Sequence, residues 1–416
     1  MHEQDSVAVI GAGIIGTTIA YALAREGRRV LLLDRAEPGR GGASFGNAGH
    51  LATELFEPLP SPQLLVGFWR ELFALKGPLD IPLRRLPAFL PWSARFARAA
   101  FRRHANTQHL APIVRPAVEA LEEMLREIQR PDLLRQNGHY EIWLDERASA
   151  RAGAQARTME RLGVPTAHAP MDLLQAAQRA AGGRRAAGLW FPKSAHVVDP
   201  LEVVRAFATA ALERGATVLQ RHARTLRTRG DHIEIATDAE PVIARAVVIC
   251  AGAWSAPLLE PFHLNVPLEA ARGYHVELPH QSALIDAPVL YANEKVLVTP
   301  MVLRLRASSF MEFSGVDAPA DARKPARIRA TLRKLGYACE LSGDSWVGPR
   351  PVLPDYLPAI GKVPGVPNLF YSFGHQHIGL TVAAVNAGLV ADLFAERQPR
   401  HDISAFDLRR FGAHRH

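Results

Sequence analysis

One segment near the start constrains the fold more than any other part of the chain. An apolar strand beginning at Val7 runs into the glycine turn Gly11-Ala-Gly13-Ile-Ile-Gly16, and a second apolar strand ends at Asp34. Gly11 permits a tight turn, Gly13 lets backbone N–H groups approach a pyrophosphate at the helix N-terminus, and Gly16 lets the helix pack on the strand. Asp34 is placed to bind a ribose hydroxyl. The segment predicts a βαβ unit that binds a dinucleotide, and by itself it leaves both NAD and FAD open.

The next segment is small and polar. After Asp34-Arg35 the chain reads Gly41-Gly-Ala-Ser44-Phe-Gly-Asn47-Ala-Gly49-His50. This composition is typical of a surface loop, but here it follows the residue expected at the ribose. Small residues let a main chain lie close to a ring, and serine and asparagine add hydrogen bonds with little bulk. The segment resembles the Ser-x-x-Asn-(Ala/Gly)-Gly sequence of the FAD-dependent D-amino-acid oxidase and dehydrogenase superfamily, where it reaches the isoalloxazine.

Later segments are similar to the same superfamily and occur in the same order. Residues 246–255 form an apolar strand that runs into a small-residue turn, like the strand by which these flavoproteins return to the dinucleotide. Residues 348–361 match the family pattern Gly-x-Arg-Pro-x-x-Pro-Asp-x-x-Pro-x-Ile-Gly. Residues 368–381 are similar to the family's C-terminal glycine loop, which feeds the last helix. The resemblance therefore reaches both ends of the chain.

We expect an α/β fold in which a Rossmann-like FAD-binding domain is interleaved with an α+β substrate domain that has a mostly antiparallel sheet. The FAD-binding domain is expected to comprise residues 1–57, 196–255 and 345–416, and the substrate domain residues 58–195 and 256–344. The sequence predicts a helix from Pro200 to Arg214, with Asp199 as its N-cap and Gly215 as its stop. Further strands are expected at 140–144, 217–220, 233–237, 247–250, 275–278, 296–299 and 310–314.

The resemblance implies that an arginine clamps the carboxylate of an amino-acid substrate while its Cα hydrogen faces flavin N5, which accepts a hydride equivalent. Arg350 matches this arginine through the Gly-x-Arg-Pro motif. A guanidinium suits the task because it holds a carboxylate through two parallel hydrogen bonds. Arg304 and Arg306 are weaker candidates for the same role, and a surface arginine that caps the Pro-rich turn is the structural alternative for Arg350.

The C-terminal loop is expected to stabilise reduced flavin. If a final helix spans Leu380 to Phe394, its N-terminal amides and dipole face the N1/C2 carbonyl side, where negative charge accumulates. D-amino-acid dehydrogenases usually show Gly-His-Gly-x-x-Gly-Trp-Thr here, whereas this chain has Gln376, His377 and Leu380 at three of these positions. The substrate preference of the generic family is therefore not carried over to this chain.

Histidines and tyrosines supply the other candidates for contact with the substrate. A histidine at His50, His375 or His377 suits acceptance of a proton from the substrate ammonium, because its pKa lies near neutrality. Each of these rings can equally bond only to flavin or backbone. Tyr274 and Tyr291 offer hydroxyls, although a strand tyrosine is more often packed with its hydroxyl at the rim. The predicted catalytic residues are Arg350, His50, Tyr274 and His377.

The resemblance also assigns the cofactor contacts. At Arg224 the family commonly has an apolar residue beside the adenine, so we expect a backbone contact there. No cysteine stands just before Pro354-Asp355, where the sarcosine-oxidase branch attaches flavin covalently, and we expect noncovalent FAD. We expect no metal site. The predicted cofactor-binding residues are Gly11, Gly13, Ile14, Ile15, Gly16, Asp34, Arg35, Ser44, Asn47, Ala48, Gly49, Arg224, Ala251, Gly252, Gly374, His375, Gly379, Leu380 and Thr381.

Composition is consistent with such an enzyme. With 416 residues, 48% of them hydrophobic, the chain is long enough for two domains. Its two cysteines are far apart in sequence, which favours a reducing compartment, and from the polar N-terminus we expect no signal peptide. We expect a cytoplasmic protein without a transmembrane span.

The net charge of +8 raises the question of an anionic partner. Residues 68–103 interleave aromatic side chains with arginines, which suits either an amphipathic helical cover of the substrate domain or peripheral contact with the inner face of a membrane. We favour the helical cover, because apolar periodicity more often marks a core face. No recognition motif accompanies the charge, so we expect no nucleic-acid partner.

The sequence predicts oxidation of a D-amino or D-imino acid, with electrons passed to a quinone or a partner protein. The flavin loop and the His-rich loop resemble those of D-hydroxyproline dehydrogenase-like members, so the substrate prediction is cis-4-hydroxy-D-proline or D-proline. The alternatives are a glycine- or sarcosine-type amine oxidase and an FAD-carrying subunit of a multi-subunit electron-transfer complex.

Overall fold

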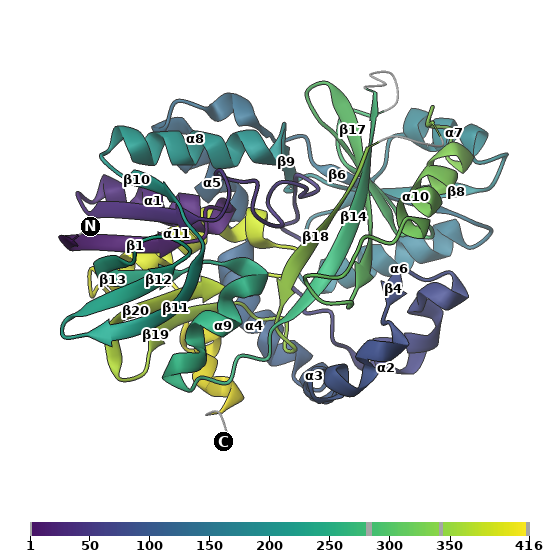
Figure 1. Ribbon diagram of the computed structural model, residues 1–416. Helices are drawn as coiled ribbons and strands as arrows, with labels where there is room; N and C mark the ends of the chain where they lie inside the picture. The colour runs from purple at the N-terminus through teal and green to yellow at the C-terminus, as the bar shows by residue number, and fades with distance from the viewer. Residues whose placement is uncertain (1, 280–284, 341–343, 413–416) are drawn as a thin grey trace.

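Two large sheets form the framework of the computed structural model, which describes residues 2–279, 285–340 and 344–412 (Figure 1). The first sheet, on the left of Figure 1, has a parallel centre in the order β10-β2-β1-β13-β20. These strands are β1 (His2–Ile10), β2 (Arg29–Asp34), β10 (Thr217–Gln220), β13 (Val242–Ile249) and β20 (Val366–Phe373). Three antiparallel strands complete it: β11 (Ala223–Arg229), β12 (His232–Thr237) and β19 (Ala359–Val363).

Both faces of the first sheet are buried, as is usual for a parallel sheet. Alternate residues of β1 point to opposite faces, so Val7 and Val9 enter one core cluster while Ala8 and Ile10 enter another. Three helices cover the first of these faces, α1 (Ile14–Arg25), α8 (Pro200–Glu213) and α11 (Gly379–Phe394). The near-continuous apolar run of this strand is therefore a consequence of burial on both sides.

Local sequence signals set the ends of the helices in this layer. The Asp199 side chain accepts a hydrogen bond from Leu201 N at 2.8 Å and caps α8, and Gly215 follows the helix with a φ of +86°. The predicted helix from Pro200 to Arg214 is confirmed to within one residue at its end. The helix α11 begins one residue before the predicted Leu380 and ends at Phe394 as expected.

The second sheet is mostly antiparallel and lies on the right of Figure 1. Its strands are, in spatial order, β18 (Ser345–Val352), β14 (Glu269–Pro279), β17 (Arg304–Glu312), β16 (Val296–Pro300), β15 (Val289–Tyr291), β6 (His139–Leu144), β8 (Ala186–Phe191) and β7 (Ala167–His168). Parallel pairing is found between β15 and β6 and between β17 and β4 (Leu79–Asp80). Buried residues of α10 (Arg323–Lys334) and α7 (Met171–Ala180) join these strands in one core cluster.

A small third sheet and several helices join the two large sheets. The third sheet consists of β3 (His50–Leu51), β9 (Ala195–Val197) and β5 (Leu134–Arg135). The other α-helices are α2 (Pro62–Gly67), α3 (Leu86–Ala100), α4 (Arg103–Val114), α5 (Ala117–Glu127), α6 (Ala148–Arg161) and α9 (Ser255–Leu259). Short 3-10 helices occupy residues 68–71, 73–75, 83–85, 131–133, 252–254, 260–262, 404–406 and 408–411.

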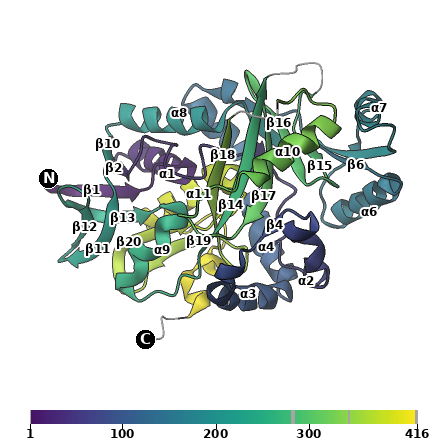
Figure 2. The same cartoon turned by 45° about the vertical axis from the view of Figure 1, so that its right-hand side comes forward.

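The stretch 68–103 is not one continuous helix. It contains three short 3-10 turns, followed by α3. Figure 2 shows α3 below the second sheet, beside α2. Within α3, Phe89 and Trp92 are buried and pack against Phe313, with ring centroids 4.7 and 5.3 Å apart. Phe89 and Trp92 thus cover part of the core, whereas Trp69 and Phe101 of the same stretch are exposed. Within the described ranges, no helix has the length and apolar character needed to cross a membrane.

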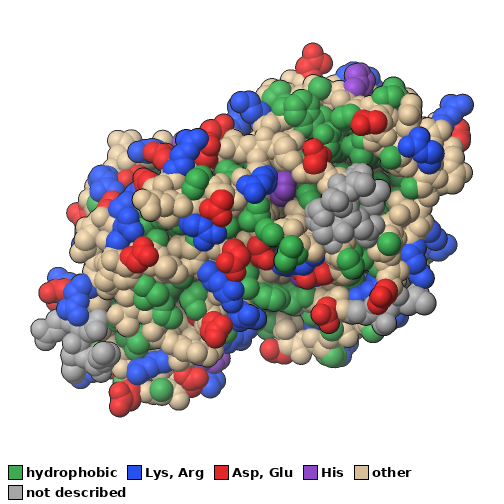
Figure 3. Space-filling view, turned by 90° about the horizontal axis from the view of Figure 1, so that it is seen from above, with side chains coloured by type: hydrophobic (Ala, Val, Ile, Leu, Met, Phe, Trp, Pro, Cys, Tyr) green, Lys and Arg blue, Asp and Glu red, His purple; other side chains and the backbone are tan. Residues whose placement is uncertain are grey.

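The predicted fold class is confirmed, since an α/β layer with a parallel sheet lies beside a mostly antiparallel sheet. All seven predicted strands are present, but three have wrong limits: 247–250 covers only the last three residues of β13, 275–278 is only part of β14, and 310–314 overlaps only the end of β17. We propose to keep the interleaved domain division with one change. Because β18 pairs with β14, residues 345–352 lie in the second sheet and not with the dinucleotide-binding layer. On the face seen in Figure 3, basic and acidic side chains are interspersed.

Candidate active site

A cavity of about 610 Å³ lies where the two sheets meet. Gly11, Gly13 and Asp34 line one end of it, and Arg350 and His377 line another part of its wall. Its volume is within the range of about 300–1,000 Å³ typical of small-molecule sites. Of the predicted site residues, the cavity is lined by Gly11, Gly13, Ile14, Ile15, Asp34, Arg35, Ser44, Asn47, Ala48, His50, Arg224, Ala251, Gly252, Arg350, His375, His377, Gly379 and Leu380.

The glycine turn is held by close backbone contacts. Gly11 has a φ of +109°, and a Cβ there would lie 2.4 Å from Cys250 O. At Gly16 a Cβ would lie 1.7 Å from Gly11 O, so neither position accepts a side chain. The Asp34 carboxylate accepts hydrogen bonds from Ala12 N at 2.7 Å and Ala36 N at 3.1 Å, which fixes it at the end of β2. Such a cradle fits the ribose and pyrophosphate of a dinucleotide.

The loop after Asp34 is anchored from both sides. Ser44 Oγ accepts a hydrogen bond from Ile14 N at 2.9 Å, at the N-terminus of α1. The buried Arg306 donates to Asn47 O at 2.6 Å and to Glu277 Oε1 at 2.6 Å. Arg304 pairs with Glu277 Oε1 at 2.9 Å and with Asp199. Arg304 and Arg306 therefore hold the framework, and the structure does not support their role as substrate clamps.

Arg350 stands apart from these framework arginines. Its Nη1 donates to Phe310 O at 3.1 Å, and no carboxylate of the described residues forms an ion pair with it. A Cβ at Gly273, on the neighbouring strand, would lie 2.1 Å from Arg350 Nη2, so glycine is needed for the guanidinium to cross β14. Burial lowers the pKa of this guanidinium from its usual value. The cavity wall thus carries a cation that forms no ion pair with the described residues.

Two aromatic residues near Arg350 were not predicted. Phe310 lines the cavity with a φ of +71°, a backbone conformation that is unfavourable for a bulky residue and is enriched at functional sites. Trp346 stacks on His275 with ring centroids 5.2 Å apart. A Cβ at Gly46 or Gly348 would lie within 2.1 or 1.9 Å of the Trp346 ring. Those two glycines are the only sequence signal by which Trp346 could have been found.

The histidines occupy different environments. His377 exposes its ring to the cavity, and burial together with the nearby Arg350 lowers its pKa to about 4. The His375 ring instead meets Asn386 Oδ1 of α11 at 3.2 Å, so it serves the framework of the wall. Burial lowers the pKa of His50 to about 3, and its ring faces His139. Gln376 Nε2 is buried beside the cavity without a hydrogen-bond partner in the described part of the chain.

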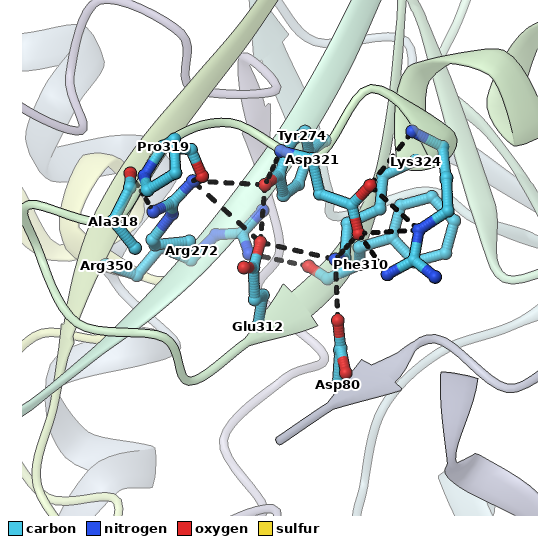
Figure 4. A network of polar contacts seen from close by, with 11 residues as sticks. Asp80, Arg272, Tyr274, Phe310, Glu312, Ala318, Pro319, Asp321, Lys324 and Arg350 are labelled. Carbon is cyan, nitrogen blue, oxygen red and sulfur yellow. Dashed lines mark hydrogen bonds and ion pairs between the residues drawn. The ribbon is translucent and has the colours of Figure 1, made fainter. Parts of the chain in front are cut away.

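Tyr274 does not lie on the cavity, which corrects the prediction for this residue. Its hydroxyl donates to Glu312 and accepts hydrogen bonds from Arg272 Nη2 at 3.1 Å and Asp321 N at 3.0 Å (Figure 4). Figure 4 shows Arg350 beside this network, on the neighbouring strand. Tyr291 is likewise engaged, since its hydroxyl lies 2.8 Å from that of Tyr337 in the core of the second sheet.

Four predicted cofactor residues do not line the cavity and lie behind its wall; one of them is Gly16, beneath the turn. Gly374 has a φ of +76°, and a Cβ there would lie 2.7 Å from Leu353. Gly49 also has a φ of +76°, and Thr381 Oγ1 accepts a hydrogen bond from Ala52 N at 3.3 Å. Gly16, Gly49, Gly374 and Thr381 therefore shape the main chain that lines the cavity.

Comparison with known proteins identifies the family. The DAO family, described as FAD dependent oxidoreductase, matches residues 6–393. The chain belongs to this family. It is an FAD-dependent oxidoreductase, which confirms the predicted cofactor and enzyme class. D-amino acid dehydrogenase 2 from Ralstonia nicotianae is 31% identical over 97% of this chain and 100% of that protein. A D-amino-acid oxidase from Bradyrhizobium diazoefficiens is 29% identical over 99% of this chain and 100% of that protein.

Solved structures agree on the fold of this flavoenzyme. Glycine oxidase from Geobacillus kaustophilus has a TM-score of 0.77 at 21% identity and covers 98% of this chain and 99% of its own. L-proline dehydrogenase from P. horikoshii has a TM-score of 0.71 at 18% identity and covers 99% of this chain and 98% of its own. At these identities the likeness shows the shared architecture alone.

Proposed function

We propose that this flavoenzyme oxidises the Cα–N bond of a D-amino or D-imino acid to the corresponding imine. The observation that carries the proposal is the Arg350 guanidinium, which lies on the cavity wall without a carboxylate partner among the described residues. A half-buried cation of this kind favours an anionic ligand, and the planar fork matches a carboxylate through two hydrogen bonds. The names of the two relatives, both acting on D-amino acids, support the stereochemistry.

The flavin would lie along the cavity from Asp34 to the start of α11. We propose that Asp34 holds the ribose, that the turn from Gly11 to Gly16 holds the pyrophosphate, and that residues 44–49 flank the ring. The main chain from Gly374 to Thr381 opens α11, whose N-terminal dipole favours negative charge on the ring. When bound, FAD supplies the two-electron acceptor for the reaction.

The protein residues would bind and orient the substrate. Arg350 fixes the carboxylate, and Phe310 and Met311 offer apolar surface on the same cavity. His377 is neutral above a pH of about 4 and lines the same cavity, so its ring can accept a hydrogen bond from the substrate nitrogen. Binding of a carboxylate beside Arg350 would partly cancel the positive charge that lowers the pKa of His377. We assign this role to His377 and not to His50, because the His50 ring faces His139.

Among such substrates we propose D-proline or cis-4-hydroxy-D-proline. The apolar surface of Phe310 and Met311 suits a saturated ring. Ser308 Oγ and Gln376 Nε2 are buried at the cavity and have no hydrogen-bond partner in the described residues. Each could bond to a ring hydroxyl, which would favour the hydroxylated imino acid over an aliphatic amino acid.

We further propose a quinone or an electron-transfer protein as the acceptor, reached at a membrane surface. The region around α3 exposes large apolar side chains next to arginines, with Leu83, Leu90 and Trp69 exposed at 83%, 63% and 68%. Such a surface fits the anionic face of a bilayer. Flotation with vesicles that contain anionic lipid tests this, and equal binding to neutral vesicles, or none to either, would contradict it.

Product analysis tests the reaction itself. The purified flavoenzyme is incubated with D-proline, cis-4-hydroxy-D-proline, D-alanine, glycine, sarcosine and their L-enantiomers where they exist, with a soluble quinone as acceptor. We expect the cyclic imine carboxylate from the D-imino acids as the main product. Turnover of glycine or sarcosine without turnover of the D-imino acids would favour the amine-oxidase alternative. No turnover without added cell extract would favour a subunit that requires its partners.

A further inference from the structure

A second group of polar side chains converges beside the cavity. It joins His50 of β3, Glu54 in the following turn and His139 of β6. Glu54 Oε1 lies 3.9 Å from His50 Nε2 and 3.6 Å from His139 Nε2, and the three ligand atoms all lie within 4.8 Å of one another. Their side chains are 8%, 6% and 3% exposed, in the order His50, Glu54 and His139. Three potential metal ligands thus face one point inside the protein.

Three histidine nitrogens in and beside this cluster lack hydrogen-bond partners. His50 Nε2 is buried and has no hydrogen-bond partner among the residues that the structure describes. Nδ1 of His139 and Nδ1 of His196 likewise have no hydrogen-bond partner among these residues. His196 lies on β9, opposite His50 of β3 in the small sheet. Among the residues that the structure describes, no lysine or arginine forms an ion pair with Glu54. A buried carboxylate without a cation is unfavourable, so a positive charge at this point would offset the charge of Glu54 and give the buried His50 Nε2 a partner.

We propose that His50, Glu54 and His139 bind a divalent transition metal ion, with zinc as the best match. Zinc bonds to nitrogen and oxygen are about 2.0–2.2 Å long, which separates the ligand atoms of a tetrahedral site by about 3.4 Å. The observed 3.6 and 3.9 Å need only a small closing movement. Two imidazoles with one carboxylate form a known zinc-binding set with an open fourth position, whereas magnesium and calcium prefer oxygen ligands alone.

The surroundings of the cluster support this assignment. Ser194 Oγ donates to Glu54 Oε2 at 2.6 Å and orients the carboxylate, as outer hydrogen bonds do in metal sites. The metal would connect the chain that follows the flavin loop to β6 of the second sheet. It would therefore position His50 on the cavity wall and tie the two sheets together next to the site.

Metal content measured on the holoenzyme tests the proposal. The protein is prepared without a histidine tag, treated with EDTA, incubated with zinc sulfate and desalted, and zinc and FAD are then quantified. We expect about one zinc per chain for the wild type and for the control His168→Asn, whose histidine is exposed on β7. For His139→Asn and Glu54→Gln we expect zinc affinity at least about 100-fold weaker with FAD retained.

Two results would overturn the proposal: a wild type that retains no zinc after desalting, or variants that bind zinc as the wild type does. A measurement on the wild type alone covers the case in which the variants do not fold. Cobalt added to the EDTA-treated holoenzyme should produce visible d–d bands at longer wavelengths than the flavin absorption, and zinc should remove them. Absence of these bands would contradict the site independently of any variant.

Discussion

The unpaired guanidinium on the cavity wall leads to a quantitative prediction for Arg350→Leu. The wild-type side chain donates only to Phe310 O in the described structure, which leaves further N–H groups for a substrate carboxylate. Two charge-assisted hydrogen bonds contribute about 3–4 kcal/mol after the cost of desolvation. Since about 1.4 kcal/mol corresponds to a tenfold change, kcat/KM should fall by roughly 10²- to 10³-fold.

The assay is steady-state turnover of D-proline with a soluble quinone, together with the visible spectrum of the purified variant. The loss should appear mainly as a higher KM, because the clamp binds the substrate before and during the reaction. The flavin spectrum should stay at full intensity, since Arg350 is assigned to the substrate and not to FAD. Arg350→Lys should recover part of the loss, because lysine restores the charge without the planar fork.

Arg224→Leu is the matched control. Arg224 lines the cavity and is exposed, and it was assigned to the adenine region. Its replacement should leave the KM for the substrate unchanged, whatever it does to FAD affinity. A KM within about twofold of wild type for Arg350→Leu would refute the clamp. Loss of FAD from Arg350→Leu would instead assign this residue to the cofactor.

Three further predictions follow from the same geometry. Acid precipitation should release the flavin into the supernatant, since we propose noncovalent FAD; yellow colour in the pellet would contradict this. Burial lowers the pKa of His275 and of His375 to about 4, so the unfolded chain binds more protons than the folded chain below pH 6.5. The free energy of unfolding should therefore fall as the pH drops from about 6.5 to 4, by up to about 3 kcal/mol for each histidine. A free energy of unfolding in urea that is the same at pH 7 and at about pH 4.5 would refute this reasoning. Gly46→Ala places a Cβ 2.1 Å from the Trp346 ring, so it should lower the free energy of unfolding by about 1–3 kcal/mol and weaken FAD binding. Gly67→Ala is the control, because a Cβ there meets nothing within 4 Å, and it should not affect FAD binding. Equal thermal stability and flavin content in the two variants would contradict this prediction.

Much of the fold could be predicted because its signals are local. The glycine turn before α1, the Asp199 cap of α8 and the apolar runs of β1 and β13 each specify structure within a few residues. The limits of β14 and β17 were missed because polar residues interrupt their apolar pattern. Arg272 and Arg306 are buried in these strands through partners far away in the sequence, and a pattern of single residues does not reveal such pairing.

In the candidate site too, residues within local motifs were predicted and residues placed by long-range contacts were not. Asp34 and Arg350 lie in motifs whose neighbours determine their place, and both line the cavity as expected. Tyr274 was misplaced because the direction of its side chain depends on Glu312 of the next strand. The proposed metal site was not foreseen, since His139 reaches Glu54 only through the tertiary fold.

The most direct test of the central claim is anaerobic mixing of the purified flavoenzyme with D-proline and, separately, with L-proline, while the flavin absorbance is followed. The account predicts that D-proline bleaches the oxidised flavin band and that L-proline leaves it unchanged. Bleaching by the L-enantiomer would contradict the proposed stereochemistry. A flavin that stays oxidised with D-proline, cis-4-hydroxy-D-proline and other D-amino acids would contradict the proposed reaction.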